Sequence, residues 1–343
     1  MKAKAVWILV LGAALLALTL GPAAQSQEKG SLRVGFNTWV GYGPLYIAQE
    51  KKFFADEGLM VELERIEGTP ERRGALIAKR LDILGSTLDD LVVGASQGVE
   101  ATLIAACDES NGADGIVVKN DIADVKGLAG RQIAVQPGFV NHFFLLYVLD
   151  KNGMKPEDVK IEALDPDKAG AAFVAGQIDC AVTWEPWLSK TKERKDGKVL
   201  LTTKDYPGVV VDCLIARNDL IKDRPADLKK FVNAWNNAVA FLANNPDEGN
   251  EIIAKNMGLK KEEVADMLSG VKLFGVRENQ GYVGTGKCAE VTAKAADLLL
   301  AAKVIETRPD TAKLISTEFV AGKKRDHPEH PMGPKKDQPE EKK

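Results

Sequence analysis

From Ser31 onward, short apolar runs alternate with segments of helical period, and this alternation constrains the fold most. Residues 32–36 are typical of a buried strand, and residues 44–54 follow with a helical pattern. The pattern restarts in the middle of the chain, where strand-like residues 132–135 precede an amphipathic stretch at 141–152. Strands that alternate with helices form mainly parallel sheets covered by helices. The sequence therefore predicts an α/β protein with two doubly wound lobes.

The order of these segments sets the predicted domain boundaries. We expect the first lobe to comprise residues 30–118 and 217–320, and the second lobe to comprise residues 119–212. A long β-branched run at 209–216 would carry the chain back to the first lobe, so hinges are expected near 115–119 and 209–216. Two lobes suit a chain of 343 residues, because single domains usually hold about 100–200 residues.

The two ends of the chain differ from its body in composition. Residues 1–26 begin with Lys2 and Lys4, continue with an apolar run and end in small residues, which is the layout of a cleaved secretory signal peptide. The run is shorter than the roughly 20 residues that span a bilayer. No cysteine lies near the expected cleavage site, so we expect a periplasmic protein that is not a lipoprotein. Residues 321–343 are rich in Lys, Pro and Glu and are expected to be disordered.

Charge and cysteine content exclude several classes of function. The net charge is −3, and no basic stripe is visible, so we expect no nucleic-acid partner. The spacings of Cys107, Cys180, Cys213 and Cys288 match no metal motif, and we expect no cofactor and no metal. An oxidising compartment would permit one disulfide, and buried free thiols are the other interpretation. No nucleophile–base pair stands out, so an enzyme is not expected.

Ligands of open α/β sheets bind beyond the carboxyl ends of the strands, so the residues after each predicted strand are the candidate site. In the first lobe these candidates are Thr38, Trp39, Tyr42, Thr87, Asp89, Asp108 and Asn111. Thr87 is also expected to cap the following helix, with Asp90 completing a capping box. A plain turn would explain Asn111, which precedes a glycine.

The second lobe and the returning strand supply the remaining candidates. These are Gln136, Asn141, His142, Trp184, Glu185 and Asp212. Glu185 lies between Trp184 and Trp187, and because Glu is a poor N-cap, local structure does not easily explain it. Asp212 lies inside an apolar run, where a buried acid is costly unless it is paired. His142 is either a ligand contact or a residue of a helix's first turn.

Four runs of the sequence together resemble a known family. They are WVGYGPLYIA at 39–48, LAGRQIAV at 128–135, AFVAGQID at 172–179 and TWEPW at 183–187. The chain resembles the nitrate/sulfonate/taurine-type substrate-binding proteins of ABC importers, which share a fold with thiamine-pyrimidine precursor synthases. The resemblance spans about residues 31–320. It implies a type II periplasmic-binding fold that closes on a small ligand like a hinge. It also implies an ABC transporter permease at the inner membrane as partner, and we expect a monomer.

The strand-end residues themselves favour a cationic ligand. The acids are Asp89, Asp108, Asp114, Glu185 and Asp212, and the aromatic residues are Trp39, Tyr42, Trp184 and Trp187. These loops contain no Arg or Lys. Acids and aromatic faces suit an organic cation, since each cation–π contact contributes about 0.5–2 kcal/mol. The main hypothesis is therefore a small cationic or amidine-like nitrogen compound. A taurine-, alkanesulfonate- or nitrate-type anion and a pyrimidine remain alternatives, and a ligand-sensing partner of a membrane receptor is the alternative class.

Overall fold

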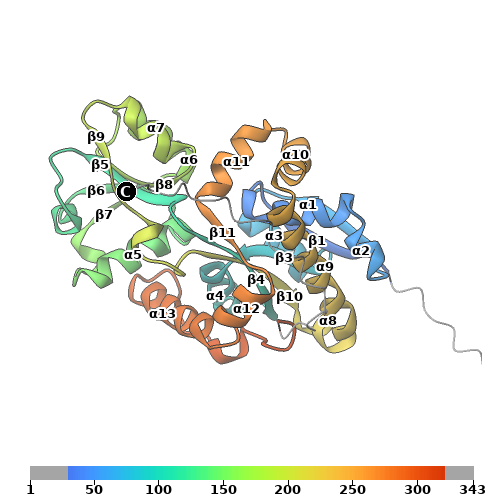
Figure 1. The fold of residues 1–343 in the computed structure, drawn as a ribbon. Coiled ribbons are helices and arrows are strands. Elements are labelled where there is room, and N and C mark those ends of the chain that lie inside the picture. Colours follow the sequence, from blue (N-terminus) through green and yellow to red (C-terminus); the bar gives the residue numbers. More distant parts are fainter. Residues whose placement is uncertain (1–29, 321–343) are drawn as a thin grey trace, which may run out of the picture. The chain divides into compact units, whose positions relative to one another are not determined.

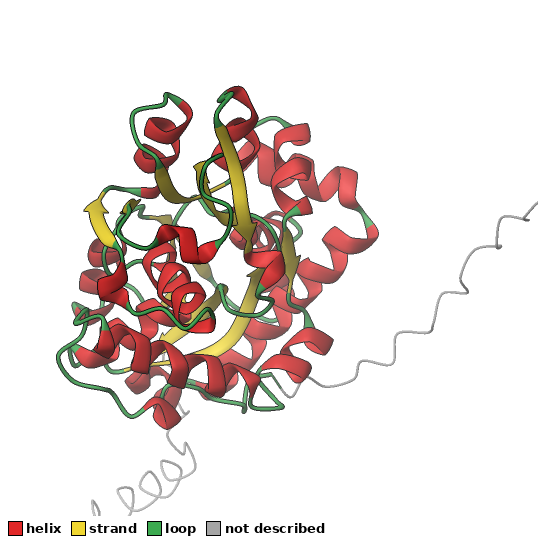
Figure 2. Cartoon of the chain, turned by 90° about the vertical axis from the view of Figure 1, so that its left-hand side faces the viewer, coloured by secondary structure: helices red, strands yellow, loops and turns green. Residues whose placement is uncertain are grey.

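The computed structural model describes residues 30–320, and the unit that begins at Leu32 holds its strands and helices. The predicted signal peptide at 1–26 and the predicted disordered tail at 321–343 lie outside the described residues. Within 30–320, no helix combines the length and apolar character needed to cross a membrane. The strands form two separate sheets, and helices flank them on both sides (Figure 2).

The first sheet has six strands in the order β11-β4-β10-β3-β1-β2. Their bounds are β1 (Leu32–Phe36), β2 (Val61–Arg65), β3 (Ile83–Thr87), β4 (Ala101–Ser110), β10 (Val211–Arg217) and β11 (Val271–Leu273). β1 runs parallel to β2 and β3, whereas β10 runs antiparallel between β3 and β4. The sheet is therefore mixed, because a strand from the second half of the chain is inserted into its centre.

The second sheet has five strands in the order β7-β6-β8-β5-β9. Their bounds are β5 (Asp114–Lys119), β6 (Gln132–Val135), β7 (Lys160–Ala163), β8 (Cys180–Trp184) and β9 (Gly197–Thr202). β6 is parallel to both β7 and β8, and β5 is antiparallel to both β8 and β9. These strands lie together on the left of Figure 1.

The chain passes between the two sheets earlier than the sequence suggested. β5 pairs only within the second sheet, although residues 114–118 were assigned to the first lobe. The reason is that Ile116, Val117 and Val118 are fully buried between β8 and β9. The sheets are thus joined by residues 111–113 and 203–210, and most of the predicted hinge residues belong to β5 and β10. The two-lobe division and the hinge motion remain predictions.

Helices pack around both sheets. The first ten are α1 (Gly43–Glu50), α2 (Phe53–Asp56), α3 (Thr69–Ile77), α4 (Leu88–Ser96), α5 (Val140–Lys151), α6 (Pro166–Val174), α7 (Trp187–Lys190), α8 (Asn218–Asp223), α9 (Pro225–Asn244) and α10 (Pro246–Met257). The last three are α11 (Lys261–Ser269), α12 (Val276–Tyr282) and α13 (Lys287–Ala301). α5, α6 and α7 belong to the second sheet, and α9 packs on α1 and α2 of the first. Phe231 of α9 stacks on Phe54 of α2 with ring centroids 5.2 Å apart.

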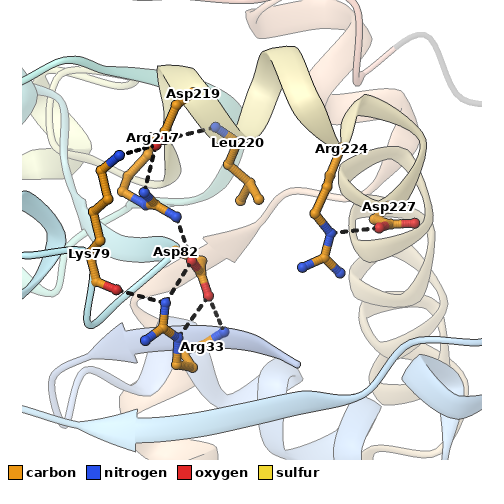
Figure 3. A network of polar contacts seen from close by, with 8 residues as sticks. All are labelled: Arg33, Lys79, Asp82, Arg217, Asp219, Leu220, Arg224 and Asp227. Carbon is orange, nitrogen blue, oxygen red and sulfur yellow. Dashed lines mark hydrogen bonds and ion pairs between the residues drawn. The ribbon is translucent and has the colours of Figure 1, made fainter. Parts of the chain in front are cut away.

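A buried carboxylate links the returning strand β10 to strand β1, which lies on the other side of β3 in the sheet (Figure 3). Asp82, 4% exposed, accepts a hydrogen bond from Arg33 Nε of β1 at 3.0 Å and from Arg217 Nη2 of β10 at 2.7 Å. Burial raises the pKa of Asp82, but the hydrogen bonds from the two guanidinium groups outweigh burial, and the pKa is lowered. This contact joins strands that are 184 positions apart.

All four cysteines are buried, and the structure contains them as free thiols. Burial raises the pKa of each one, to about 11 for Cys180 and to about 12 for Cys288. A thiol with a raised pKa is mostly protonated and therefore unreactive at neutral pH. The cysteines thus act here as small apolar residues of the core.

Candidate functional site

A cavity of about 180 Å³ lies where the carboxyl ends of strands from both sheets meet. It is lined by Asn37, Tyr42, Glu67, Thr69, Arg72, Ser86, Thr87, Asp89, Asp90, Gln136, Gly138, Phe139, Val140, Asp165, Pro166, Asp167, Trp184 and Asp212. The loops after β1, β2 and β3 contribute one wall, and those after β6 and β7, with the end of β8, contribute the other. This placement follows the rule that ligand sites lie outside the carboxyl ends of strands.

Two larger hollows, of about 690 and 970 Å³, are lined mainly by aliphatic side chains and helix surfaces. Six of the thirteen predicted binding residues line the strand-end cavity instead. They are Tyr42, Thr87, Asp89, Gln136, Trp184 and Asp212. The small cavity is therefore the candidate binding site, because it brings together polar side chains from distant parts of the chain.

Tyr42 and Asp212 are hydrogen-bonded to each other in the first wall, which is the side of the cavity formed after β1, β2 and β3. The phenol of Tyr42 donates a 2.5 Å hydrogen bond to Asp212 Oδ1, and both side chains are buried. Burial raises the pKa of Asp212 to about 7. Burial, followed by the charge of Asp212, raises the pKa of Tyr42 well above 10. Near neutral pH, Asp212 can therefore exchange a proton while Tyr42 keeps its own.

Asp89 is a buried acid of the cavity with one oxygen that has no hydrogen-bond partner. It is 2% exposed, and its Oδ2 atom accepts no hydrogen bond. Burial raises the pKa of Asp89 to about 7, against the weaker lowering effect of a hydrogen bond from Thr87. The side-chain oxygens of Asn37 and Gln136 are also buried without a partner. An amide can rotate to present its nitrogen, but an ionised carboxylate can only accept hydrogen bonds, so this wall favours a ligand that donates them.

The predicted capping box at the start of α4 is wrong. Thr87 occupies the N-cap position, but its side chain makes no capping hydrogen bond. Asp90 does not complete a capping box, because it accepts hydrogen bonds from Ser86 Oγ at 2.5 Å and from Arg73 Nη1 at 2.7 Å. The hydroxyl of Thr87 is thus not used by a helix cap and lies in the cavity wall.

Asp167, which is not among the predicted site residues, lines the cavity and binds two tryptophans. It lies in the first turn of α6, and its Oδ1 atom accepts hydrogen bonds from the indole nitrogens of Trp184 at 2.9 Å and Trp187 at 3.0 Å. Trp184 lines the cavity, while Trp187 does not. One carboxylate therefore sets the orientation of both rings.

The interpretation that local structure leaves Glu185 unexplained is wrong. Glu185 Oε2 accepts a hydrogen bond from the backbone N–H of Ser189 at 3.1 Å, and Oε1 accepts one from the Ser189 hydroxyl at 2.9 Å. The side chain reaches forward to the short helix α7 from the residue before its N-cap, Pro186. Glu185 does not line the cavity.

Thr38, Trp39 and Asp108 lie next to the cavity without lining it. The backbone and hydroxyl of Thr38 both donate hydrogen bonds to Glu67. The indole nitrogen of Trp39 donates to Asp108 Oδ1 at 3.2 Å, and Asp108 is fully buried behind the first wall. A Cβ atom at Gly41 would lie 2.0 Å from Asp108 Oδ2 and 2.5 Å from Trp39 Nε1, so any larger residue at that position would displace one of these side chains.

Asn111, Asn141 and His142 also lie outside the cavity lining. Asn111 is in the turn between β4 and β5, and its backbone N–H donates to Gly270. The Asn141 side chain donates to the carbonyl of Val182 at 3.4 Å. His142 Nδ1 accepts a hydrogen bond from the backbone of Gly138 at 3.2 Å, and the ring lines the hollow of about 970 Å³. Burial lowers the pKa of His142 to about 4, so the ring is neutral at pH 7.

The most consequential residue that sequence reasoning missed is Arg72. The cavity loops contain no Arg or Lys, but Arg72 enters the lining from helix α3. Its guanidinium donates to the carbonyls of Ile66 and Glu67 at 2.7 and 2.8 Å, and its buried Nε has no hydrogen-bond partner. Among the other missed residues, Glu67 and Thr69 follow β2 and residues 165–167 follow β7, and the same strand-end rule identifies them when it is applied to those strands. The remaining ones lie close to predicted residues, in β3 and α4, in the loops after β1 and β6, or at the start of α5.

Comparisons with known proteins agree with this architecture. A family model described as the NMT1-like family matches residues 25–257. The chain is 26% identical over 306 residues to a putative aliphatic sulfonates-binding protein of Bacillus subtilis, which covers 88% of this chain and 90% of that protein. It is 28% identical over 237 residues to the taurine-binding periplasmic protein of Escherichia coli, covering 66% and 73%.

The crystal structure of the periplasmic aliphatic sulphonate binding protein SsuA from Escherichia coli superposes with a TM-score of 0.71. It is 20% identical and covers 83% of this chain and 92% of that chain, so the likeness establishes the periplasmic-binding-protein fold. The predicted α/β fold and the resemblance to nitrate/sulfonate/taurine-type substrate-binding proteins are confirmed. The chain belongs to the NMT1-like family.

Proposed function

We propose that the chain is the extracytoplasmic solute-binding component of an ABC importer, and that its solute is a small cationic or amidine-like nitrogen compound. The observation that carries the choice of solute is the buried, unpartnered Oδ2 of Asp89 in the cavity wall. A buried acceptor without a donor costs about 1–3 kcal/mol, and more when it is charged. A ligand N–H group at this atom would remove that cost.

The charges around the cavity support this class of solute. The acids of the lining are Glu67, Asp89, Asp90, Asp165, Asp167 and Asp212, and Arg72 is the one basic residue among the lining residues. Arg72 already donates three hydrogen bonds to protein atoms. The lining therefore holds more acidic than basic side chains, and Trp184 adds an aromatic ring that can lie against a delocalised cation.

The cavity volume limits the size of the solute. The site holds about 180 Å³, and a protein cavity of about 150 Å³ is known to hold benzene. A solute of roughly the size of an alkylguanidinium or a short amine fits this space, whereas drug-sized ligands occupy about 300–1,000 Å³.

A taurine- or alkanesulfonate-type solute is the second candidate. Its support is the names of the similar proteins from Bacillus subtilis and Escherichia coli, together with the unpartnered Nε of Arg72. An anion could accept a hydrogen bond from that atom. Taurine also carries an ammonium group, which the acidic residues of the lining could hold.

Calorimetry with the mature protein tests the two candidates. The solutes are methylguanidinium, ethylamine, urea, taurine, ethanesulfonate and nitrate, each titrated into the wild type, Asp89→Asn and Arg72→Lys. The cationic candidate predicts that methylguanidinium binds and that Asp89→Asn weakens it at least about tenfold, which is 1.4 kcal/mol. Arg72→Lys, which keeps the charge, should change it little.

Tight binding of ethanesulfonate, weakened by Arg72→Lys and not by Asp89→Asn, would instead establish the anionic candidate. Binding of none of these solutes would overturn both. The surface variant Asp297→Asn, whose side chain pairs with Arg308, is the control for nonspecific effects of removing a carboxylate.

A further inference from the structure

Two buried carboxyl groups lie side by side at the cavity wall. In the ladder between β4 and β10, Asp108 is the direct partner of Asp212. Asp108 is fully buried, and Asp212 is 7% exposed and lines the cavity. Directly opposite residues in an antiparallel pair have Cβ atoms about 4.5–5.5 Å apart. The two carboxyl groups therefore face each other at short range in a low-dielectric environment, directly before an irregularity in the ladder between Asp212 and Cys213.

Neither carboxyl group has a cationic partner among residues 30–320. Asp108 accepts hydrogen bonds from the Trp39 indole, and Asp212 accepts one from the Tyr42 phenol, and both donors are neutral. No ion pair of the described residues includes Asp108, Asp212 or Asp89. Other buried acids in this structure differ, since Asp82 is paired with two guanidinium groups.

The surrounding elements supply mostly acids. The titratable or charged groups that act on the pair are Tyr42, Arg72, Asp89, Glu109 and Asp114. The neighbouring thiols of Cys107 and Cys213 are themselves influenced by the two aspartates. Glu109 is neutralised by Lys272 of β11 at 2.8 Å, and Arg72 is the one cation that acts on Asp212. The field around the pair therefore opposes further negative charge.

Without a bound cation, these acids can avoid mutual repulsion by binding protons. Burial, and then the charge of Asp212, raises the pKa of Asp108 well above its usual range. Burial raises the pKa of both Asp89 and Asp212 to about 7. Two carboxyl groups at this distance cannot both ionise at low cost, so they titrate as a pair.

We propose that Asp89, Asp108 and Asp212 form a proton-exchange cluster, in which entry of a cationic solute into the cavity releases a proton to the solvent. The inference rests on the proposed function, because it requires a cation in the cavity. The unpartnered Oδ2 of Asp89 and the cavity position of Asp212 place two members where the solute charge would lie. One O–H bond dissociates, the solute takes the place of the proton beside the carboxylate, and the buffer accepts the proton.

The exchange has a definite sign. A cation favours the ionised carboxylates, so it lowers their pKa and its affinity rises as the pH rises. The gain is up to about tenfold per pH unit for each proton released, and it diminishes above about pH 7, where Asp89 and Asp212 are mostly ionised before the solute binds. A neutral solute of the same shape, such as urea, should show no such rise.

Calorimetry in paired buffers measures the exchange directly. Methylguanidinium is titrated into the protein in phosphate and in Tris, whose ionisation enthalpies differ, and the difference in observed heat gives the number of protons released. We expect about one proton per solute near pH 7 and fewer near pH 9. In Asp212→Asn the count should fall by at least half, because the carboxyl group that lines the cavity and has a pKa of about 7 is replaced by a group that does not titrate. Asp297→Asn should leave the count unchanged.

An infrared spectrum of the free protein tests the cluster without a ligand. A protonated carboxyl band should be present at pH 7, should disappear as the pH rises, and should weaken in Asp108→Asn and in Asp212→Asn. Binding of methylguanidinium with equal heats in both buffers would overturn the exchange and leave the proposed function intact. Absence of any cation binding would overturn both. Absence of the infrared band would overturn the protonated cluster, and with it the exchange, and would leave the proposed function intact.

Discussion

The backbone N–H of Ser189 donates a 3.1 Å hydrogen bond to Glu185 Oε2, which commits this carboxylate to helix α7 and not to the cavity. We therefore expect Glu185→Gln to leave solute affinity within about twofold of the wild type. Gln retains an acceptor for Ser189, so the free energy of unfolding should fall by no more than about 1 kcal/mol. Calorimetry and urea unfolding measure the two quantities. A tenfold loss of affinity with unchanged stability would show that Glu185 contacts the solute.

Asp167 should control the tryptophans of the second wall. In Asp167→Ala both indole nitrogens lose their acceptor, and a net hydrogen bond contributes about 0.5–1.5 kcal/mol, or more with a charged partner. We expect a shifted tryptophan emission spectrum and an affinity lower by about tenfold, since Trp184 is then free to change rotamer. Asp167→Asn keeps an oxygen acceptor, so its affinity should lie between those of the wild type and Asp167→Ala. An unchanged spectrum in Asp167→Ala would contradict this role.

Asp82 should contribute strongly to stability. Removing one partner of a buried ion pair costs about 3–5 kcal/mol, because the remaining charges are left without compensation. Asp82→Asn leaves Arg33 and Arg217 without their common acceptor, so we expect a loss at the lower end of that range in urea unfolding. Because the folded pKa of Asp82 is lowered, its contribution is present above about pH 4 and is lost as the pH falls further. In the control Asp297→Asn, which removes an exposed ion pair with Arg308, the free energy of unfolding should fall by less than about 1 kcal/mol.

His142 should make the protein sensitive to acid. Its pKa in the folded protein is about 4, below the value of about 6.5 for an exposed histidine. The unfolded chain therefore binds the proton more readily, and the wild type loses stability between about pH 6.5 and pH 4. His142→Asn retains an acceptor for the Gly138 N–H and removes the titration. Relative to the wild type, the variant should therefore gain stability as the pH falls from about 6.5 to 4. A difference that does not change with pH would contradict a buried neutral ring.

Asp89 should have the opposite pH dependence. Its pKa of about 7 in the folded protein is raised above the ordinary value of 3.8, so its stability contribution is present at low pH and is lost as the pH rises through about 7. Relative to Asp89→Asn, the free wild type should lose up to about 1.4 kcal/mol per pH unit between pH 4 and 7. Unfolding at several pH values measures this. A parallel pH profile would mean that Asp89 is ionised throughout.

Some features of the site follow from short stretches of sequence. Tyr42, Asp89 and Gln136 each stand within a few residues of a strand's carboxyl end, and all three line the cavity. These positions could be predicted because strand and helix periodicity, and the rule for strand ends, depend only on residues that are close together in the sequence. The same rule, applied to the loops after β2 and β7, would have included Glu67 and Asp167. The hydrophobic pattern of β10 also identified Asp212 as a buried acid before its neighbours were known.

By itself, the sequence determined the α/β class, the order of strands and helices, and the acidic and aromatic character of the strand ends, because periodicity and composition are local properties. Tertiary structure alone decided that β5 pairs within the second sheet, that Arg72 reaches the cavity from a helix, and that Asp108 faces Asp212. These relationships depend on strand register and helix orientation, which are set by packing between segments far apart in the chain. The same packing leaves Asp89 Oδ2 without a donor, and that atom carries the proposed function.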